Sequence, residues 1–487
     1  MLRLLLRGHL PGIVILPLLL GPAAGQPAEP PLSVQNYPEG TILRYPVPLL
    51  MGDLADRGQT ELVVVNKSSD RPTRELKGQV LNGRFKALTE LVPGRNDLVL
   101  RAGDDELPFM LHYKPQTTPY VVRMIYLTDD SGDTTYQTQL DDDPQDYATK
   151  LDTAMKLMQT FIAERMHALG FGRTTFNLEY DAEGKVRVHT VKADHPAEHY
   201  DAMGSEAWFK HLHGWLGKEF STETGMNVVI PAFTRFDPET RKVRGHTALG
   251  GGGLALFGSG GLFTWPSSLA DVGRTFQDPR PTDVDRVQDD SNGRQTIWGT
   301  ASTGIGATLH ELGHAFGLFH CKDRWGIMTR GFDHFGRTFT FVDPPSGWNA
   351  ATLEFSEGQV ARLAPMSGAG LKALRWFAMD ARDWAESGGP RVSNDAQSGE
   401  LVIESDHGIR FVGFDRPPDT VTFTPFLNTP DPPRRAGFRW DQLRQIIGSG
   451  KMRLRVIDEQ GFILMPEVEF PEAPAAAEPQ EQEATSP

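Results

Sequence analysis

Apolar residues in the first part of this 487-residue chain occur in short runs separated by turn residues. Such runs occupy residues 60–65, 85–88 and 96–100, with Gly, Asn and Pro between them. This spacing is typical of short antiparallel strands. It predicts a small β-sandwich that begins after Pro31 and ends near Tyr113.

The middle of the chain combines strand-like and helix-like patterns. Residues 120–127 form a continuous apolar run, and residues 145–169 place apolar side chains on one face of a helix. Residues 249–262 are rich in Gly with interleaved Leu and Phe, which indicates an irregular edge strand, and a further helix is expected to begin near Thr303. Additional strands are predicted at residues 176–180, 186–191 and 227–233. Together these elements predict a mixed sheet backed by helices.

The C-terminal third returns to a β pattern after a short helix predicted at residues 357–363, which Ser356 would cap. Strand-like runs occur at residues 409–414, 421–423 and 452–457. A helix is predicted among them at residues 440–447, and we expect a second β-rich accessory domain here. The last residues are mostly Pro, Ala, Glu and Gln, a composition typical of disorder.

The overall composition is that of a globular protein and argues against two classes of partner. Hydrophobic residues make up 39% of the chain and charged residues 23%, which provides ample apolar material for a core. The formal net charge of -14 argues against nucleic acid or an anionic membrane surface as the natural partner.

The N-terminus has the pattern of an export signal. Arg3 and Arg7 precede a short apolar run at residues 13–20, and small residues follow at 22–25. We predict a signal peptide over residues 1–25 and a secreted or periplasmic protein, with an uncleaved N-terminal anchor as the alternative. No later stretch has the roughly 20 apolar residues of a membrane span, so no transmembrane span is expected in the mature chain.

The chain has one cysteine, Cys321, and therefore cannot form an intramolecular disulfide. Because no Cys stands at the predicted cleavage site, we expect no lipid anchor. Cys321 directly follows a histidine-rich motif, but a small buried hydrophobe is the favoured interpretation over a metal ligand.

That motif, residues 310–320, carries the strongest chemical signal: His-Glu-Leu-Gly-His-Ala-Phe-Gly-Leu-Phe-His. Two histidines four residues apart on a helix project from one face and can reach a single ion. Gly317 is free to adopt a positive φ that ends the helix and lets His320 approach from another side. Three imidazoles leave an open coordination position, as in catalytic zinc sites, so we predict that His310, His314 and His320 bind Zn²⁺.

Glu311 is the predicted catalytic residue. It follows the first predicted ligand, where its carboxylate can take a proton from a zinc-bound water. Two alternatives stay open: a helix whose histidines belong to the core, and a three-histidine site that has lost activity. His334 could compete with His320 as a ligand, although the spacing from Gly317 favours His320.

A second motif, Trp-Gly-Ile-Met-Thr-Arg-Gly, occupies residues 325–331 and places Met328 eight positions after His320. It resembles the methionine turn of the metzincin clan of zinc peptidases, where the Met forms an apolar floor beneath the metal and is not a ligand. Several metzincins have a Tyr two residues after this Met, where this chain has Arg330. A salt bridge is favoured for Arg330 over a role in stabilising the oxyanion.

The chain further resembles a little-characterised, mainly fungal family assigned as zinc metallopeptidases. The resemblance rests on residues 85–96 and 120–130, the histidine motif and residues 326–333, and it covers about residues 60–379. It implies an α+β fold with a metzincin-like zinc peptidase catalytic domain, a mixed twisted sheet plus helices, between N-terminal and C-terminal β-rich domains. It also implies zinc as the cofactor and a peptidase activity without a defined substrate.

The expected domain order combines the patterns with this resemblance. The signal peptide at 1–25 is followed by an N-terminal β-sandwich-like domain at 32–115, a metzincin-like catalytic domain at 118–385, a C-terminal β-rich domain at 398–468 and a disordered tail at 470–487.

The predicted function is that of a zinc-dependent endopeptidase, which hydrolyses peptide bonds by Glu-assisted attack of a zinc-bound water on a peptide or protein substrate. Residues 249–257 could pair with an extended substrate backbone, with a flexible surface loop as an equal alternative. The alternative function is a non-catalytic zinc-containing binding module whose β domains bind a cell-surface polymer or a partner protein. The sequence does not define the oligomeric state.

Overall fold

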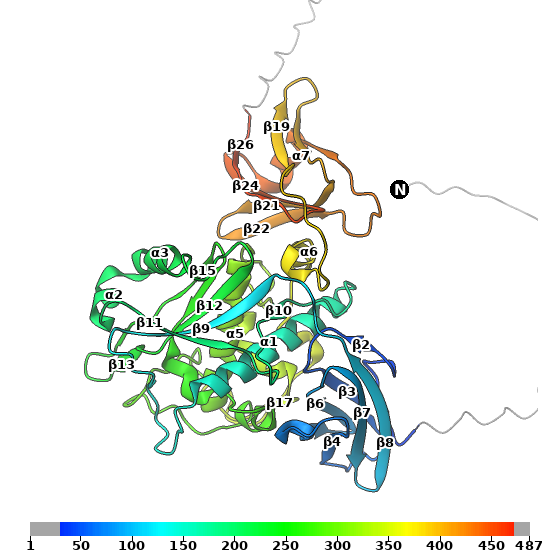
Figure 1. Ribbon diagram of the computed structural model, residues 1–487, viewed down its shortest axis with the longest axis vertical. Coiled ribbons are helices and arrows are strands. Elements are labelled where there is room, and N and C mark those ends of the chain that lie inside the picture. Colours follow the sequence, from blue (N-terminus) through cyan, green and yellow to red (C-terminus); the bar gives the residue numbers. More distant parts are fainter. Residues whose placement is uncertain (1–29, 472–487) are drawn as a thin grey trace, which may run out of the picture.

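A computed structural model of the chain describes residues 30–471, which form an N-terminal, a central and a C-terminal part (Figure 1). The predicted signal peptide at residues 1–25 lies outside the described residues, as does the predicted tail from residue 472 onwards. Phe470, which the sequence pattern assigns to the tail, is described and buried. Its ring packs edge-to-face on Trp440, with the ring centroids 5.2 Å apart.

The N-terminal part is an antiparallel β structure whose two halves share one strand. Its strands are β1 (Leu32–Val34), β2 (Ile42–Leu43), β3 (Leu49–Leu54), β4 (Leu62–Asn66), β5 (Glu75–Leu81), β6 (Arg84–Leu88), β7 (Gly94–Ala102) and β8 (Asp105–Tyr113). They are ordered β1-β3-β6-β5-β4-β7-β8-β2, and β5 pairs with both β4 and β6. All pairs are antiparallel except β2 with β8. Apolar side chains from both halves, including Leu50, Leu62 and Leu111, form one core.

The central part contains a mostly parallel sheet in the order β10-β9-β12-β16-β15, with β11 also paired to β9. Its strands are β9 (Val121–Thr128), β10 (Asn177–Leu178), β11 (Val188–Lys192), β12 (Gly225–Pro231), β15 (Ala248–Gly251) and β16 (Leu254–Phe257). β15 lies at one end of this order and is antiparallel to β16. The structure thus has the mixed sheet and the α-plus-β character that the sequence predicts.

Helices cover both faces of this sheet. They are α1 (Tyr147–Ala168), α2 (Ala197–Met203), α3 (Ser205–Leu216) and α5 (Ile297–Ala315). Met124 and Tyr126 of β9 belong to the core that contains α1 and α5, whereas Ile125 and Leu127 pack on the α2–α3 side. This alternation follows from the period of two in a strand. In the described part of the chain, no helix combines the length and the apolar character needed to cross a bilayer.

Several short elements complete the central part and its borders. The strands and helices are β13 (Arg235–Asp237), β14 (Lys242–Arg244), α4 (Val272–Thr275), β17 (Val342–Asp343), β18 (Leu353–Glu354) and α6 (Pro365–Lys372). The 3-10 turns are η1 (Pro72–Arg74), η2 (Ser259–Thr264), η3 (Leu269–Asp271), η4 (Arg330–Thr338), η5 (Glu357–Gln359) and η6 (Arg375–Phe377).

The C-terminal part consists of two small antiparallel sheets and one helix. The first sheet has the order β19-β20-β23, and the second has the order β22-β21-β24-β25 with β26 also paired to β24. The elements are β19 (Arg391–Asp395), β20 (Glu400–Glu404), β21 (Ile409–Arg416), β22 (Asp419–Pro425), β23 (Arg435–Arg439), α7 (Trp440–Ile447), β24 (Lys451–Asp458), β25 (Ile463–Leu464) and β26 (Glu467–Glu469).

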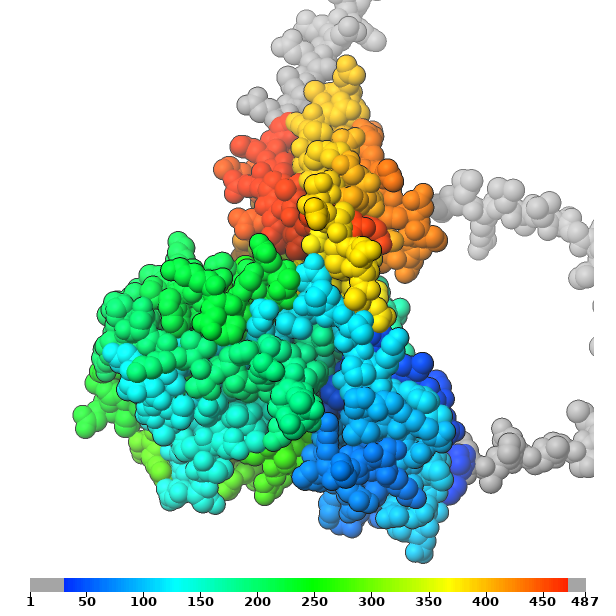
Figure 2. Space-filling view, viewed as in Figure 1, coloured from blue at the N-terminus to red at the C-terminus, as the bar shows by residue number. Residues whose placement is uncertain are grey.

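The three parts share apolar contacts. Val47 and Leu88 of the N-terminal part, and Phe411 and Ile457 of the C-terminal part, belong to the same buried cluster as the core around α1 and α5. Figure 2 shows the C-terminal part, coloured yellow to red, resting directly on the central part. Burial of large apolar side chains at both borders fixes the parts against one another.

Two helical predictions need correction, and two further helices were not predicted. The helix of the histidine motif begins at Ile297 and not near Thr303. The sequence pattern misses its first turns because they contain glycines, which weaken a helical pattern. Close packing against other segments requires glycine at these positions. The helix predicted at 357–363 is only the 3-10 turn η5, although Ser356 and Gln359 do form its capping box. The pair α2 and α3 was not predicted, since Gly204 interrupts its pattern.

A buried polar network attaches the N-terminal part to α1. The Tyr37 and Tyr45 hydroxyls donate to the Glu164 carboxylate over 2.5 and 2.9 Å, and Arg173 pairs with the same carboxylate at 2.9 Å. Only 7% of Glu164 is exposed. The Glu164 carboxylate of α1 therefore binds one arginine and two tyrosine hydroxyls at the border between the N-terminal and central parts.

We expect Glu164→Ala to lower the free energy of unfolding by about 3–5 kcal/mol, because it leaves the Arg173 guanidinium, whose side chain is only 10% exposed, without its carboxylate partner. Denaturant unfolding measures the change. Glu106→Ala is the matched control, since Glu106 forms an exposed ion pair with Arg101, and exposed pairs contribute little. Equal effects of the two variants would contradict the assigned role of Glu164.

Candidate metal centre

The helix α5 that carries the histidine motif lies in the middle of the central part. Thr296 caps its N-terminus, with the side-chain oxygen accepting a hydrogen bond from the Gly299 amide at 3.2 Å. A Cβ added at Gly306 would lie 2.1 Å from the Phe332 carbonyl oxygen. Glycine therefore allows the chain after the motif to pack directly on the helix backbone.

The structure brings the three predicted histidines together. His314 Nε2 lies 3.1 Å from His310 Nε2 and 3.1 Å from His320 Nε2. Across residues 30–471, these three form the one group of at least three His, Cys, Asp or Glu side chains whose ligand atoms all lie within 4.8 Å of one another. Glu311, beside the first of them, is also largely buried, with 6% of its surface exposed.

Two of these rings carry their proton on Nδ1, the ring nitrogen that does not face the other histidines. His310 Nδ1 lies 2.8 Å from the Ile327 carbonyl oxygen, and His314 Nδ1 lies 2.7 Å from the Leu318 carbonyl oxygen. A carbonyl only accepts, so each Nδ1 carries the hydrogen and each Nε2 keeps a lone pair. Two such lone pairs facing each other have no proton to share.

A divalent cation fits this donor set. Imidazole nitrogens bound to Zn²⁺ at 2.0–2.1 Å in tetrahedral geometry lie about 3.3 Å apart, close to the separations found here. The carbonyl partners on Nδ1 are the contacts that orient histidine ligands in metal sites. The residues therefore fit a zinc ion.

Burial sets the protonation of the site. Removal from solvent, followed by the neighbouring His314, lowers the pKa of His310 to about 3, and burial also lowers the pKa of His314. Both rings are thus neutral at neutral pH, the form in which imidazole binds a metal. Without a metal ion, burial raises the pKa of the Glu311 carboxyl to about 8. A divalent cation held by the neighbouring histidines would lower this pKa and favour the ionised carboxylate.

Gly317 ends α5 with the positive φ that the sequence predicts, +82°. The Gly317 amide donates to the His314 carbonyl at 2.9 Å, and the Leu318 amide donates to the Gly313 carbonyl at 3.0 Å. This pair of hydrogen bonds is a Schellman motif. It reverses the chain direction, so that His320 reaches the other two rings from outside the helix.

Met328 packs against the histidine helix at Gly313. It is buried, and a Cβ added at Gly313 would lie 2.3 Å from its sulfur. The neighbouring Ile327 supplies the carbonyl that accepts from His310. The turn therefore contributes a buried methionine that packs on α5 and one of the contacts that orient a histidine.

Arg330 forms the salt bridge that the sequence favours. Its Nε and Nη2 atoms donate to the two carboxylate oxygens of Asp333 at 2.9 and 3.1 Å. Asp333 is buried and also accepts from Thr303 of α5 at 2.9 Å. Sequence reasoning assigned no role to Asp333, because nothing in its local pattern distinguishes a buried carboxylate from an exposed one.

Two other candidate ligands lie outside the histidine group. Cys321 is buried, with its sulfur 3.3 Å from the Thr329 hydroxyl. The His334 ring lies between Trp325 and Trp348, at centroid distances of 4.7 and 5.6 Å. The structure therefore agrees with the choice of His320 over His334 and with Cys321 as a buried hydrophobe.

The glycine-rich segment predicted as one edge strand forms two strands, the edge strand β15 and the inner strand β16, which pairs with β15 and β12. β15 packs on the histidine helix. A Cβ added at Gly250 would lie 2.1 Å from the Glu311 carbonyl oxygen and 2.7 Å from the His314 Cβ atom. Within the described residues, β15 pairs with β16 and its other edge pairs with no strand. Unpaired amides and carbonyls of a sheet edge can bind an extended peptide.

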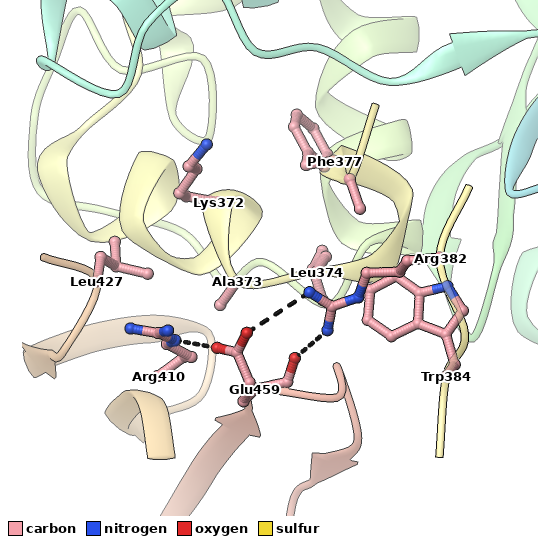
Figure 3. A pocket seen from close by; sticks show the side chains of 10 residues that line it. Lys372, Ala373, Leu374, Phe377, Arg382, Trp384, Arg410, Leu427 and Glu459 are labelled. Atoms are coloured by element: carbon pink, nitrogen blue, oxygen red, sulfur yellow. Dashed lines mark hydrogen bonds and ion pairs between the residues drawn. The ribbon is translucent and has the colours of Figure 1, made fainter. Parts of the chain in front are cut away.

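A cavity of about 260 Å³ lies between α6 and the C-terminal part and contains none of the three histidines. Figure 3 shows that Glu459 in this cavity pairs with two arginines, Arg382, at 3.5 Å, and Arg410. This cavity is separate from the histidine site.

The sequence profile of a family described as "Putative peptidase family" matches residues 31–398. A putative zinc metalloproteinase of Schizosaccharomyces pombe is 31% identical over 277 residues, which cover 53% of this chain and 45% of the relative. A putative zinc metalloproteinase of Saccharomyces cerevisiae is 25% identical over 294 residues, covering 53% and 42% of the two chains. This chain thus spans less than half of the length of these relatives.

Among solved structures, OgpA from Akkermansia muciniphila aligns with a TM-score of 0.44 and 15% identity, over 72% of this chain and 93% of that chain. That structure is of a catalytically inactive form in complex with an O-glycopeptide substrate. Wild-type OgpA aligns with a TM-score of 0.43 and 16% identity. A similarity of this size carries no argument about the activity of this chain.

The contact of β15 with α5 can be tested at two neighbouring glycines. We expect Gly250→Ala to lower the free energy of unfolding by about 1–3 kcal/mol, because the added methyl group overlaps the backbone of the histidine helix. Gly251→Ala is the control, since its added Cβ has no atom within 4 Å. Thermal unfolding of both variants measures the difference, and equal stability of the two would contradict the packing.

Proposed function

The chain belongs to this peptidase family, and on that premise we propose that it is a zinc-dependent endopeptidase acting on peptide or protein substrates. The observation that carries the proposal is the convergence of His310, His314 and His320, with two Nε2 lone pairs facing each other. The names of two relatives as zinc metalloproteinases support the same metal.

In this proposal His310, His314 and His320 hold the zinc ion through Nε2. Three protein ligands leave a fourth position for water or substrate, which is the arrangement of a catalytic rather than a structural zinc site. When bound, Zn²⁺ supplies a Lewis acid that polarises a peptide carbonyl and lowers the pKa of a coordinated water to about 7.

Glu311 moves the proton. It follows His310 on α5 and is buried, and in this proposal its carboxylate would lie beside the fourth coordination position. As a general base it accepts the water proton, and as a general acid it delivers that proton to the amine that leaves. The buried position of Glu311 favours this transfer, because bulk water is kept from exchanging the proton. No covalent intermediate with the protein is needed.

The substrate backbone would lie along the free edge of β15. This strand packs on α5 through Gly250, so a peptide added to its edge runs beside the histidine site. Main-chain hydrogen bonds to an edge strand hold a peptide extended and leave both of its ends free. That geometry supports cleavage within a chain rather than at its terminus.

Glu311→Gln tests the proton transfer. The amide keeps the size of the side chain but cannot accept the proton, so we expect hydrolysis of a mixed peptide library to fall by at least about 10²-fold. Metal analysis should still find zinc, because the three histidines are intact. Glu106→Gln, an exposed carboxylate change, should keep full activity.

Equal turnover by Glu311→Gln and wild type would refute the role of Glu311. Zinc binding without turnover by the wild-type protein would favour the non-catalytic binding module instead.

Removal of the metal tests the ligand set. A chelator should abolish hydrolysis and lower the melting temperature, since an ion that binds the folded state stabilises it. Added Zn²⁺ should restore both properties in the wild type but neither in His320→Ala, which lacks the third ligand. Restoration of the melting temperature in His320→Ala would show that the ion binds elsewhere.

A further inference from the structure

The backbone around the third histidine is bonded to the C-terminal part of the molecule. The His320 amide donates to the Pro418 carbonyl at 2.9 Å, and the Thr420 amide donates to the His320 carbonyl at 3.0 Å. Residue 320 thereby forms a parallel bridge with Asp419, the first residue of β22. Residues 417–420, which join the end of β21 to the start of β22, are called the β21–β22 turn below. The segment that brings this ring to the metal site is thus secured by a turn about a hundred residues later in the chain.

A buried cation reaches the start of the same segment. Arg455 of β24 donates through Nη1 to the Gly317 carbonyl at 2.7 Å. Its Nη2 group donates to the Thr420 hydroxyl at 3.2 Å and pairs with the Asp415 carboxylate at 3.5 Å. Only 2% of Arg455 is exposed. One guanidinium group therefore joins the turn that ends α5 to the β21–β22 turn.

The helix alone does not account for the position of His320. The Schellman hydrogen bonds fix the chain as far as Leu318. Beyond that point, the amide and the carbonyl of His320 both bind the C-terminal part. Backbone groups that bind a rigid partner lose their freedom before a ligand arrives, which favours binding.

The partner is rigid because it is packed into the main core. Phe411 of β21 and Ile457 of β24 are buried in the same cluster as Leu371 and Leu374, which flank the end of α6. Both strands therefore carry apolar anchors on the face from which Arg455 and the turn reach the histidine segment. The C-terminal part is held by its own core on the other side.

We propose that Arg455 and the β21–β22 turn are positioning residues for the third metal ligand. They hold residues 317–320 so that the His320 ring meets the other two rings, and the C-terminal part thereby controls the affinity of the site for zinc. The inference rests on the proposed zinc site. These residues lie outside residues 31–398, the stretch that the family profile matches.

The test compares Arg455→Met with Arg410→Met in the full-length protein. Arg410 lies on the adjacent strand β21, pairs with Glu459 and donates to the carbonyls of Phe426 and Thr429. Each substitution thus removes a hydrogen-bonded guanidinium group from the same sheet, but only Arg455 contacts residues 317–320.

Zinc affinity is measured by competition with a coloured chelator, and thermal unfolding of the zinc-free proteins checks that each variant is folded. We expect Arg455→Met to raise the zinc dissociation constant about 10- to 100-fold, the range for contacts that orient a ligand. Arg410→Met should keep the wild-type value. The visible absorption of the Co²⁺-loaded proteins should change for Arg455→Met alone, because it reports the ligands around the ion.

Thr420→Pro is a second variant that leaves Arg455 and Asp415 in place, and it decides the question if Arg455→Met does not fold. It deletes the amide that binds the His320 carbonyl and should likewise weaken zinc binding. Wild-type zinc affinity in both folded variants, or equal losses in Arg455→Met and Arg410→Met, would overturn the inference and leave the zinc site intact. A wild-type protein that binds no zinc would overturn the site as well.

Discussion

Two imidazole nitrogens 3.1 Å apart, each with its lone pair directed at the other, are the constraint on which this structure depends. The rings cannot relieve the contact with a hydrogen bond, because His310 and His314 both donate from Nδ1 to backbone carbonyls. They cannot readily become charged either, since burial lowers the pKa of both. A cation at the shared point satisfies both nitrogens at once, and the third ring completes a set with one position open.

The surrounding chain is built to hold this arrangement. Glycine occurs where another segment and the helix must approach closely: Gly250 of β15 meets the Glu311 carbonyl of α5, Gly306 of α5 meets the chain at Phe332, and Gly313 of α5 meets Met328. Each of these contacts would be blocked by a single methyl group. Glycine is unfavourable inside a helix, by about 1 kcal/mol relative to alanine. Close packing around the site therefore offsets a weaker helix.

These requirements explain what the sequence could and could not predict. The facing of His310 and His314 follows from the helical period, and the positive φ of Gly317 turns the chain back towards them. The final placement of His320 also depends on its backbone hydrogen bonds to Pro418 and Thr420, which no local pattern predicts. The true start of α5 was missed because its glycines weaken the helical pattern, while their reason lies in segments distant along the chain. Arg455 was missed for the same reason, since a buried arginine on a strand has the same local pattern as an exposed one.

The link between the C-terminal part and His320 also works in the opposite direction. If docking of that part raises the affinity of the site for zinc, then zinc raises the stability of the docked state by the same factor. An ion bound by three side chains within eleven residues would ordinarily stabilise only that stretch. Here Gly317 and His320 transmit the effect to Arg455 and the β21–β22 turn, which share a core with α6. Occupancy of the metal site and attachment of the C-terminal part are then two coupled equilibria, each of which favours the other.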